Sequence, residues 1–498
     1  MRIRPHDIEI PADAPFTHDL LNRKETAEIL TTLMKSIEGP YTLAVDSSWG
    51  NGKTTFLRML EKHLIREKFP VVSFNAWETD FTHSPLIALS SELFSTLKAL
   101  DRDLGANLRT LEHKMRKLSR ILLTKGVPLA ISLSGSLVSI EANEPAIGPV
   151  STAAGSIASE VLEGKLKDEP ETASEDPYSY HEVKSEIASF KKSIKATSTS
   201  LSEKFEGKPL LVIIDELDRC RPSYAVELLE IAKHFFSVDQ VVFVLAIDRS
   251  QLVHAIKSLY GNEFDSIGYL RRFIDLDFRL PDPDRREFVN ALLARTGVDE
   301  FLTQNQSESW GSPDEIRDLL LAFFGLPVLS LRRVEQAIHR LGLVLASIPH
   351  DSSIAYLPVA VAIILRTIDP VTYHQFVQAD MTDQDIIEQL FDMPGISGVM
   401  QTTQGALFEA MLIIAHVEFR AMNKELLGPN MSDYRNRRNN MTNGSRATTT
   451  EKAQAKKVME VLGEKDHMWK IVESGGSVGF ALAVQRVELF SRDLIEGT

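Results

Sequence analysis

The sequence is poor in the features that mark specialised protein classes. It has one cysteine, Cys220, which excludes a disulfide framework and a cysteine-based zinc site and is typical of a reducing compartment. It has no excess of positive charge, because 55 Lys and Arg residues against 69 Asp and Glu residues give a net charge of −14. This balance disfavours bulk electrostatic binding to nucleic acid or anionic membranes. With 43% hydrophobic and 25% charged residues, the 498-residue chain is neither fibrous nor wholly disordered.

A long hydrophobic run is also missing. The nearest approach is 126–140 (GVPLAISLSGSLVSI), which serines interrupt, whereas a membrane-spanning helix needs about 20 apolar residues. No apolar segment follows the basic residues of the first positions, so no secretory signal is visible. We therefore expect a cytoplasmic protein without a membrane span. The histidines are scattered without other ligands at metal spacing, so no zinc site is expected.

The apolar pattern indicates an α/β fold. Short apolar runs at 41–45 and 71–74 flank an amphipathic helix predicted at 54–67. Two longer runs, 210–214 and 241–247, are continuous and rich in β-branched residues, as is typical of parallel strands buried on both faces. This order favours a parallel β-sheet flanked by helices.

The segment after the first predicted strand has the residues of a phosphate-binding loop. Residues 46–55 read DSSWGNGKTT and lead directly into the predicted helix. At such a turn, backbone N–H groups and the helix N-terminus form a concave positive site that an anion can approach closely. We expect Lys53 to reach the β- and γ-phosphates of a nucleotide and the Thr54 hydroxyl to ligate Mg²⁺. The residues expected to contact the nucleotide are Ser48, Trp49, Gly50, Asn51, Gly52, Lys53, Thr54 and Thr55.

This loop departs in one position from the pattern G-x-x-x-x-G-K-[ST]. Ser47 stands where the pattern has its first glycine. Gly50 and Gly52 supply flexibility nearer the phosphates, so we expect a loop that begins with a different backbone path and still binds nucleotide.

A second acidic motif follows the strand predicted at 210–214. Asp215 stands at the carboxyl end of that strand, where parallel α/β sheets bind their ligands, and Glu216 comes next. We expect Asp215 to hold Mg²⁺ through water and Glu216 to orient or activate the attacking water. Asp215 lies 162 positions after Lys53 (215 − 53 = 162), and this separation predicts an insertion between elements of the sheet.

Four further charged residues are open to two interpretations each. Asp248 either senses the γ-phosphate or caps the helix that begins after it. Arg271 and Arg272 either act as an arginine finger across a subunit interface or are surface residues at a helix end. Arg332 either reaches the phosphates from a helical subdomain or is exposed to solvent. The sequence does not decide between these alternatives.

Together these residues resemble the KAP family of P-loop NTPases. The resemblance rests on WGNGKT (49–54), FNAW (74–77), IDELDRCRP (214–222), AID (246–248) and YLRR (269–272), and covers roughly residues 17–380. It implies an additional-strand P-loop fold with a helical lid and frequent roles in bacterial defence against phages. It also places Arg23, in LNRKE (21–25), near the nucleotide base.

The sequence departs from the family pattern at Ser47 and at Glu216, where a second aspartate is frequent. Many members carry paired transmembrane helices in the insertion, but here that region is too polar to span a membrane.

With these motifs we expect five parts. They are the N-terminal part of the NTPase core (1–100), a mostly helical insertion with a mobile acidic linker (101–206), the remainder of the core (207–282), a helical lid (283–380) and a C-terminal helical region with a flexible segment at 429–450 (381–498).

The main functional hypothesis is an ATPase that uses ATP and Mg²⁺ to drive a conformational or assembly switch. The alternative is a nucleotide-gated scaffold with little turnover, and a weaker one is a nucleic-acid-stimulated ATPase. We expect self-association through the NTPase core and an effector or sensor protein as partner. The basic segment 109–125 leaves a nucleic-acid contact open, although the net charge does not indicate one.

Overall fold

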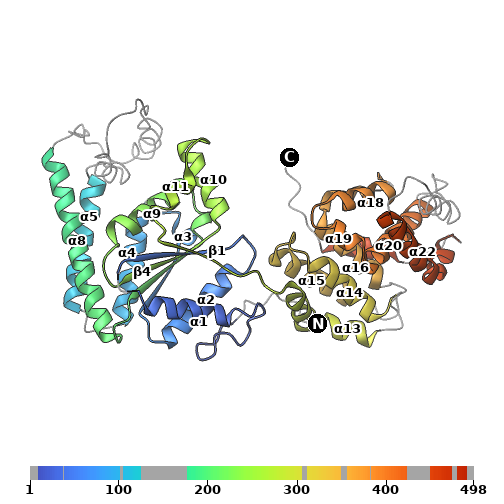
Figure 1. Cartoon of the computed structure of the whole chain (residues 1–498), viewed down its shortest axis with the longest axis horizontal. Helices are drawn as coiled ribbons and strands as arrows, with labels where there is room; N and C mark the ends of the chain where they lie inside the picture. Colours follow the sequence, from blue (N-terminus) through green and yellow to red (C-terminus); the bar gives the residue numbers. More distant parts are fainter. Residues whose placement is uncertain are drawn as a thin grey trace.

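The computed structural model describes most of the chain (Figure 1). The described residues are 9–37, 39–82, 84–100, 105–124, 177–305, 311–348, 356–378, 380–381, 383–422, 449–473 and 479–490. The segment 126–140, the acidic linker at 165–176 and nearly all of 429–450 lie outside them, so the expectations for these segments stay predictions.

A five-stranded parallel sheet forms the centre of the N-terminal half, in the order β2-β3-β4-β1-β5. Its strands are β1 (Tyr41–Asp46), β2 (Val71–Asn75), β3 (Leu210–Asp215), β4 (Val241–Ile247) and β5 (Leu276–Arg279). β4 lies between β1, which leads into the phosphate loop, and β3, which ends at the acidic motif. The additional-strand P-loop fold is therefore confirmed. All residues of β4 are buried, as its continuous apolar pattern predicts.

Helices cover both faces of this sheet. α1 (Lys24–Lys35) and α2 (Lys53–Arg66) share one apolar core with the strands. On the other face, α4 (Pro85–Leu100), α9 (Pro222–Phe235) and α10 (Arg249–Tyr260) form a second core. Because α2 is anchored along its length, the phosphate loop at its N-terminus has a rigid support.

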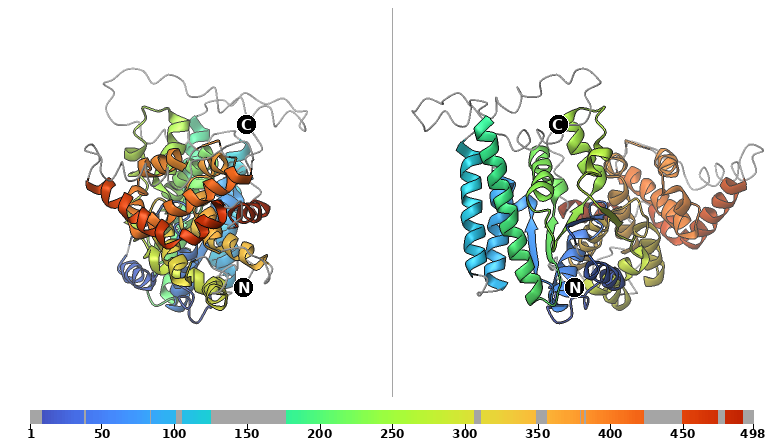
Figure 2. Two further views of the ribbon diagram at one scale, coloured as in Figure 1. Left: turned by 90° about the vertical axis from the view of Figure 1, so that its right-hand side faces the viewer. Right: turned by 60° about the vertical axis from the view of Figure 1, so that its left-hand side comes forward.

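The insertion between the two nucleotide motifs is a pair of long helices. α5 (Gly105–Thr124) and α8 (Pro177–Lys204) lie side by side and pack on α4 and α9 (Figures 1 and 2). A Lys117–Glu186 ion pair of 2.5 Å links them, and their buried residues Met115 and Phe190 join the second core. The predicted helical insertion is confirmed in the described part of this region.

The fifth strand was not predicted. β5 pairs in parallel with β1, with Leu276 opposite Leu43. Its side chains alternate between half-buried and exposed, so the sequence lacks the continuous apolar run that marks the central strands.

Beyond β5 the described residues are helical and build one large apolar core (Figure 1). Its longer helices are α12 (Arg285–Thr296), α14 (Pro313–Phe324), α15 (Leu331–Ala346), α16 (Tyr356–Ile368), α18 (Asp383–Asp392), α20 (Thr403–Met422), α22 (Thr449–Glu464) and α24 (Phe480–Leu489). Shorter helices between them are α13 (Val298–Gln304), α17 (Pro370–Val377), α19 (Ser397–Met400) and α23 (Asp466–Glu473). The predicted helical C-terminal region is confirmed. Within the described ranges, no helix combines the length and apolarity that crossing a bilayer requires.

Candidate functional site

The two sequence motifs meet at the carboxyl edge of the sheet, where parallel α/β sheets bind ligands. A pocket of about 380 Å³ opens there between the phosphate loop, the end of β3 and the helical region. Of the predicted residues it is lined by Ser48, Trp49, Gly50, Gly52, Lys53, Thr54, Thr55, Asp215, Glu216 and Arg332. Asp218, Arg219, Arg295 and Glu335 also line it and were not predicted. The volume is in the range of small-molecule and cofactor sites.

The phosphate loop needs glycine at two positions. Gly50 and Gly52 have φ values of +79° and +76°, a region that strains other residues. A Cβ at Gly50 would lie 2.9 Å from the Ser330 Cβ, and one at Gly52 would lie 2.8 Å from Leu21 Cδ1. Ser47 is not in this backbone region, and its N–H donates to the Ile247 carbonyl over 3.1 Å. The missing first glycine is therefore compatible with the loop.

Lys53 begins α2 and is buried in the site. Its Nζ donates to the Ser47 carbonyl over 3.1 Å and lies 3.6 Å from Oδ2 of Asp218. Burial lowers the pKa of Lys53, whereas Asp218 and three further carboxylates raise it. The sequence assigns Lys53 to the β- and γ-phosphates, and the structure adds a buried acidic partner, Asp218. Nothing in the spacing of the motif predicts this ion pair.

Asp215, at the end of β3, and Thr54, at the start of α2, lie next to each other in the pocket. The Glu216 N–H donates to Asp215 Oδ1 over 2.8 Å. Burial raises the pKa of Asp215, while the Glu216 N–H, the nearby Thr54 hydroxyl and Lys53 lower it. Two hard oxygen donors side by side beneath the phosphate loop suit a small divalent cation such as Mg²⁺.

We predict that Asp215→Asn stabilises the protein without nucleotide while weakening Mg²⁺-dependent binding. A pKa raised in the folded state means that the ionised carboxylate costs stability at neutral pH, a cost that appears as the pH rises above the unfolded-state pKa. Asparagine removes this cost and keeps an acceptor for the Glu216 N–H. The melting temperature at pH 7 should rise by about 2 °C or more. A lower melting temperature with unchanged Mg²⁺ dependence would contradict the assignment.

Two neighbours hold Glu216: Asn75 from the FNAW motif and Arg219 from its own motif. The Glu216 φ of +60° is strained for a residue with a side chain. Its carboxylate accepts a hydrogen bond from Asn75 Nδ2 over 3.2 Å and pairs with Arg219 at 3.0 Å. The Arg219 guanidinium in turn lies 5.8 Å from the centre of the Trp77 ring. The Asn-x-Trp and Leu-Asp-Arg segments thus converge on one carboxylate, because β2 and β3 are neighbouring strands.

Asp248 caps α10 and also supports the phosphate loop. Its Oδ1 accepts the backbone N–H groups of Ser250 (3.1 Å) and Gln251 (3.4 Å). Its Oδ2 accepts the Trp49 N–H over 3.1 Å. Of the two alternatives, the geometry shows the helix cap, and Asp248 does not line the pocket. A role in sensing phosphate stays a prediction.

Two predicted arginines contact the phosphate loop, each at a different glycine. Arg23 is buried, donates to the carbonyls of Gly52 (3.2 Å) and Pro281 (3.5 Å), and does not line the pocket. Burial lowers its pKa to about 10. Arg332 lines the pocket, and its backbone N–H donates to the Gly50 carbonyl over 3.2 Å. The first residues of α15 therefore contact the phosphate loop directly.

Arg271 and Arg272 lie elsewhere. Both are exposed, follow α11 (Ser266–Leu270) and do not line the pocket. Tyr269 anchors this segment by donating to Glu230 over 3.0 Å. Arg295, which sequence reasoning missed, is in the pocket but pairs with Glu335 at 2.9 Å. It lies in an ordinary helical pattern that gives no signal of a site.

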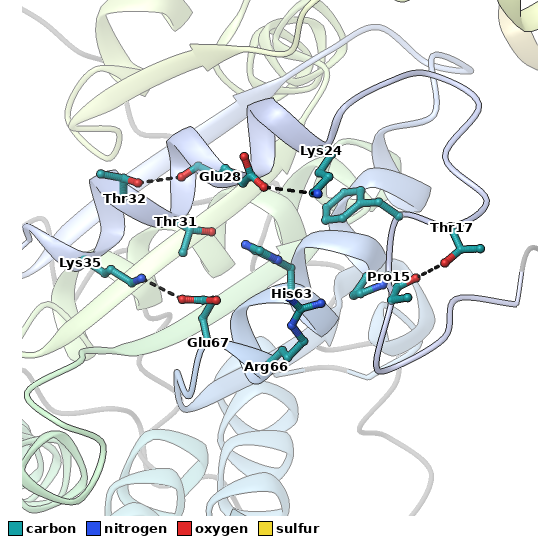
Figure 3. A pocket seen from close by; sticks show the side chains of 12 residues that line it. Pro15, Thr17, Lys24, Glu28, Thr31, Thr32, Lys35, His63, Arg66 and Glu67 are labelled. Atoms are coloured by element: carbon teal, nitrogen blue, oxygen red, sulfur yellow. Dashed lines mark hydrogen bonds and ion pairs between the residues drawn. The ribbon is translucent and has the colours of Figure 1, made fainter.

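A second pocket, of about 450 Å³, lies between α1, α2 and residues 14–17 (Figure 3). Its charged residues largely neutralise one another: Lys35 pairs with Glu67 at 2.9 Å and Lys24 with Glu28 at 3.8 Å. His63 lines this pocket, and burial lowers its pKa. In the part of the chain that the structure describes, no group of acidic, histidine or cysteine side chains could hold a metal by itself.

A parallel sheet with an added strand between the phosphate loop and the acidic strand end defines a P-loop NTPase. The chain belongs to the KAP family: a model of the KAP family P-loop domain matches residues 22–388. The resemblance inferred from the motifs is thereby confirmed.

The chain is similar to the Phage T7 exclusion protein of Escherichia coli K12, with 25% identity over 238 residues. The match covers 46% of this chain and only 30% of that protein's length. Among solved structures, ORC2 of Aeropyrum pernix (ADPNP–ADP complexes) has 12% identity and a TM-score of 0.33, with 96% of this chain and 97% of that chain covered. Drosophila ORC bound to GC-rich DNA and Cdc6 has 12% identity and a TM-score of 0.30, with coverage of 95% and 62%. Scores of this size show neither a shared function nor a shared ligand.

Proposed function

We propose that the protein binds ATP with Mg²⁺ and hydrolyses it. The observation that carries this proposal is the convergence of Lys53, the Thr54–Asp215 pair and Glu216 in one pocket beneath a glycine-containing loop. Phosphoryl transfer needs little covalent chemistry from a protein. It needs positioned cations for the phosphates and a carboxylate that orients water, and these residues offer both.

Thr54 and Asp215 are the residues that would hold the metal. When bound there, Mg²⁺ would neutralise charge on the β- and γ-phosphates. Lys53 would add a second positive charge, and the N–H groups at the start of α2 would point at the phosphate oxygens. Glu216 would hold the attacking water, and Asn75 would fix the position of its carboxylate. Arg332, at the start of α15, would contact the nucleotide from the helical region.

The same contacts supply a route from nucleotide to conformation. The Arg332 N–H to Gly50 carbonyl bond connects the phosphate loop to the helical core that follows residue 285. A nucleotide that reshapes the loop would therefore move the start of α15. In our proposal this movement drives a switch in assembly or in a protein partner. The similarity to a phage exclusion protein favours a role in defence against phages.

A second candidate function is a nucleotide-gated scaffold with little turnover. One observation favours it: Arg219 pairs with Glu216 at 3.0 Å, so this carboxylate already has a cationic partner on the side where it would hold water. In such a protein, bound ATP would hold an assembly together without being consumed. Turnover measurements on Glu216 variants separate the two functions.

ATP binding is tested most directly at Lys53. Lys53→Ala should reduce ATP affinity on the order of a hundredfold, because an ammonium that contacts phosphate in a buried site is lost. Isothermal titration calorimetry on the full chain measures this. The substitution also leaves Asp218 without its ion-pair partner, so we expect a lower melting temperature with intact secondary structure by circular dichroism. Unchanged ATP affinity in a folded variant would show that this pocket is not the nucleotide site.

A further inference from the structure

Asp218 is the buried acidic residue of the site for which the phosphate-binding motifs give no role. Its side chain is 2% exposed. It lies in the single helical turn η2 (Leu217–Arg219) directly after Glu216, and it lines the nucleotide pocket. Its Oδ2 faces two groups at once: the Lys53 ammonium at 3.6 Å and the indole N–H of Trp49, which donates to it.

The Asp218 carboxylate therefore contacts Lys53 and Trp49, the two residues that are best positioned to contact a bound phosphate. A carboxylate this deeply buried needs compensating charge, and Lys53 is the cation that it contacts. An ammonium has three donors, of which one is directed to the Ser47 carbonyl. A phosphate oxygen and the Asp218 oxygen on the same ammonium would repel each other across a poorly solvated pocket.

We propose that Asp218 is an internal competitor for the phosphate: it holds Lys53 in an ion pair that the nucleotide must displace, and it thereby sets the affinity for nucleotide. This inference rests on the proposed function of Lys53. Trp49 makes the exchange feasible, because its indole N–H still satisfies the Asp218 carboxylate when the ammonium turns to phosphate.

If Asp218 competes with phosphate for Lys53, removing the charge of Asp218 should strengthen ATP binding. Asp218→Asn keeps the size of the side chain and an oxygen for the Trp49 indole but removes the charge that holds Lys53. ATP affinity should rise about tenfold, because the nucleotide no longer displaces an ion pair. The melting temperature without nucleotide should fall, since Lys53 loses its counter-charge. The increase in melting temperature on adding saturating ATP should therefore exceed that of the wild type.

Two variants of the full chain serve as controls. Asp46→Asn removes a nearby carboxylate that also raises the pKa of Lys53 but hydrogen-bonds to the Arg249 N–H over 2.9 Å and makes no ion pair with Lys53. It should change ATP affinity by less than about twofold. Asp218→Glu keeps the charge, so its affinity should stay close to that of the wild type.

Calorimetric titration of ATP into these variants tests whether Asp218 competes with the nucleotide for Lys53. Equal or weaker ATP binding by Asp218→Asn would overturn the inference and leave Asp218 as a support of the loop. If ATP affinity rose equally in Asp46→Asn, the cause would be general charge repulsion and not competition for Lys53. If it rose equally in Asp218→Glu, the cause would be the shape of the side chain and not its charge. If Asp218→Asn does not fold, Asp218→Ser, which leaves room for a water beside Lys53, serves the same comparison.

The experiment also separates this inference from the proposed function. If the wild type binds no ATP, the proposed function is overturned as well. If the wild type binds ATP and Asp218→Asn binds it no more tightly, only the role of Asp218 is overturned.

Discussion

Replacing Glu216 by glutamine should slow ATP turnover about a hundredfold or more while changing ATP affinity by less than about threefold. Glutamine keeps the size of the side chain and an acceptor for Asn75, but it cannot take a proton from the attacking water. The phosphates are held by other residues, so binding should persist. Steady-state phosphate release and calorimetric ATP binding, measured on the same preparation, give the two quantities separately.

The exposed Glu263 provides a matched control for this variant. Glu263→Gln removes the same charge from the chain away from the pocket and should leave turnover unchanged. If the wild type shows negligible turnover that Glu216→Gln does not lower, and assembly follows ATP occupancy alone, the scaffold function is the correct one. A wild type with robust turnover that survives in Glu216→Gln would remove Glu216 from the catalytic machinery.

The sequence predicts four of the five strands and misses only the edge strand β5. The runs at 210–214 and 241–247 are apolar throughout, because strands buried on both faces exclude water on both sides. β5 has one half-buried and one exposed face, and with four residues it is too short for its alternation to be distinguished from a loop. Its position is determined by hydrogen bonds to β1, which lies over 200 residues earlier in the chain.

In the candidate site, too, some features follow from the sequence and others do not. Lys53, Thr54 and Asp215 could be predicted, because their roles follow from local strand-to-loop geometry that a short motif encodes. The contacts that surround these residues could not be predicted, because they join segments that are far apart in the sequence. Trp49 and Asp218 are 169 residues apart, and Asn75 and Glu216 are 141 apart. The first pair forms because only β4 separates β1 from β3, and the second forms because β2 and β3 are neighbours in the sheet. Nothing within either segment specifies that order.

The largest effect is expected at Arg271 and Arg272. A P-loop site needs a positive group opposite the γ-phosphate in the transition state, and a supplied arginine is typically worth about 10³–10⁵ in rate. Both arginines are exposed and lie outside their own chain's pocket, as a residue that acts on a neighbouring chain must. Alanine at either position should therefore cut turnover on the order of 10³-fold and leave ATP binding intact.

Three measurements separate this role from that of a surface arginine. Turnover per chain should rise with protein concentration as ATP-bound chains associate, which light scattering follows in parallel. Arg286→Ala, which removes an exposed arginine from α12, should leave turnover unchanged. Mixing an Arg271→Ala chain with a Lys53→Ala chain should restore part of the turnover, because the Lys53→Ala chain supplies the arginine and the Arg271→Ala chain supplies the intact phosphate loop.

One outcome would contradict this role. If a strictly monomeric, ATP-saturated protein hydrolyses ATP at a rate per chain that is independent of protein concentration, the cation must come from the same chain. Arg332, which already lines the pocket, would then be the residue to replace.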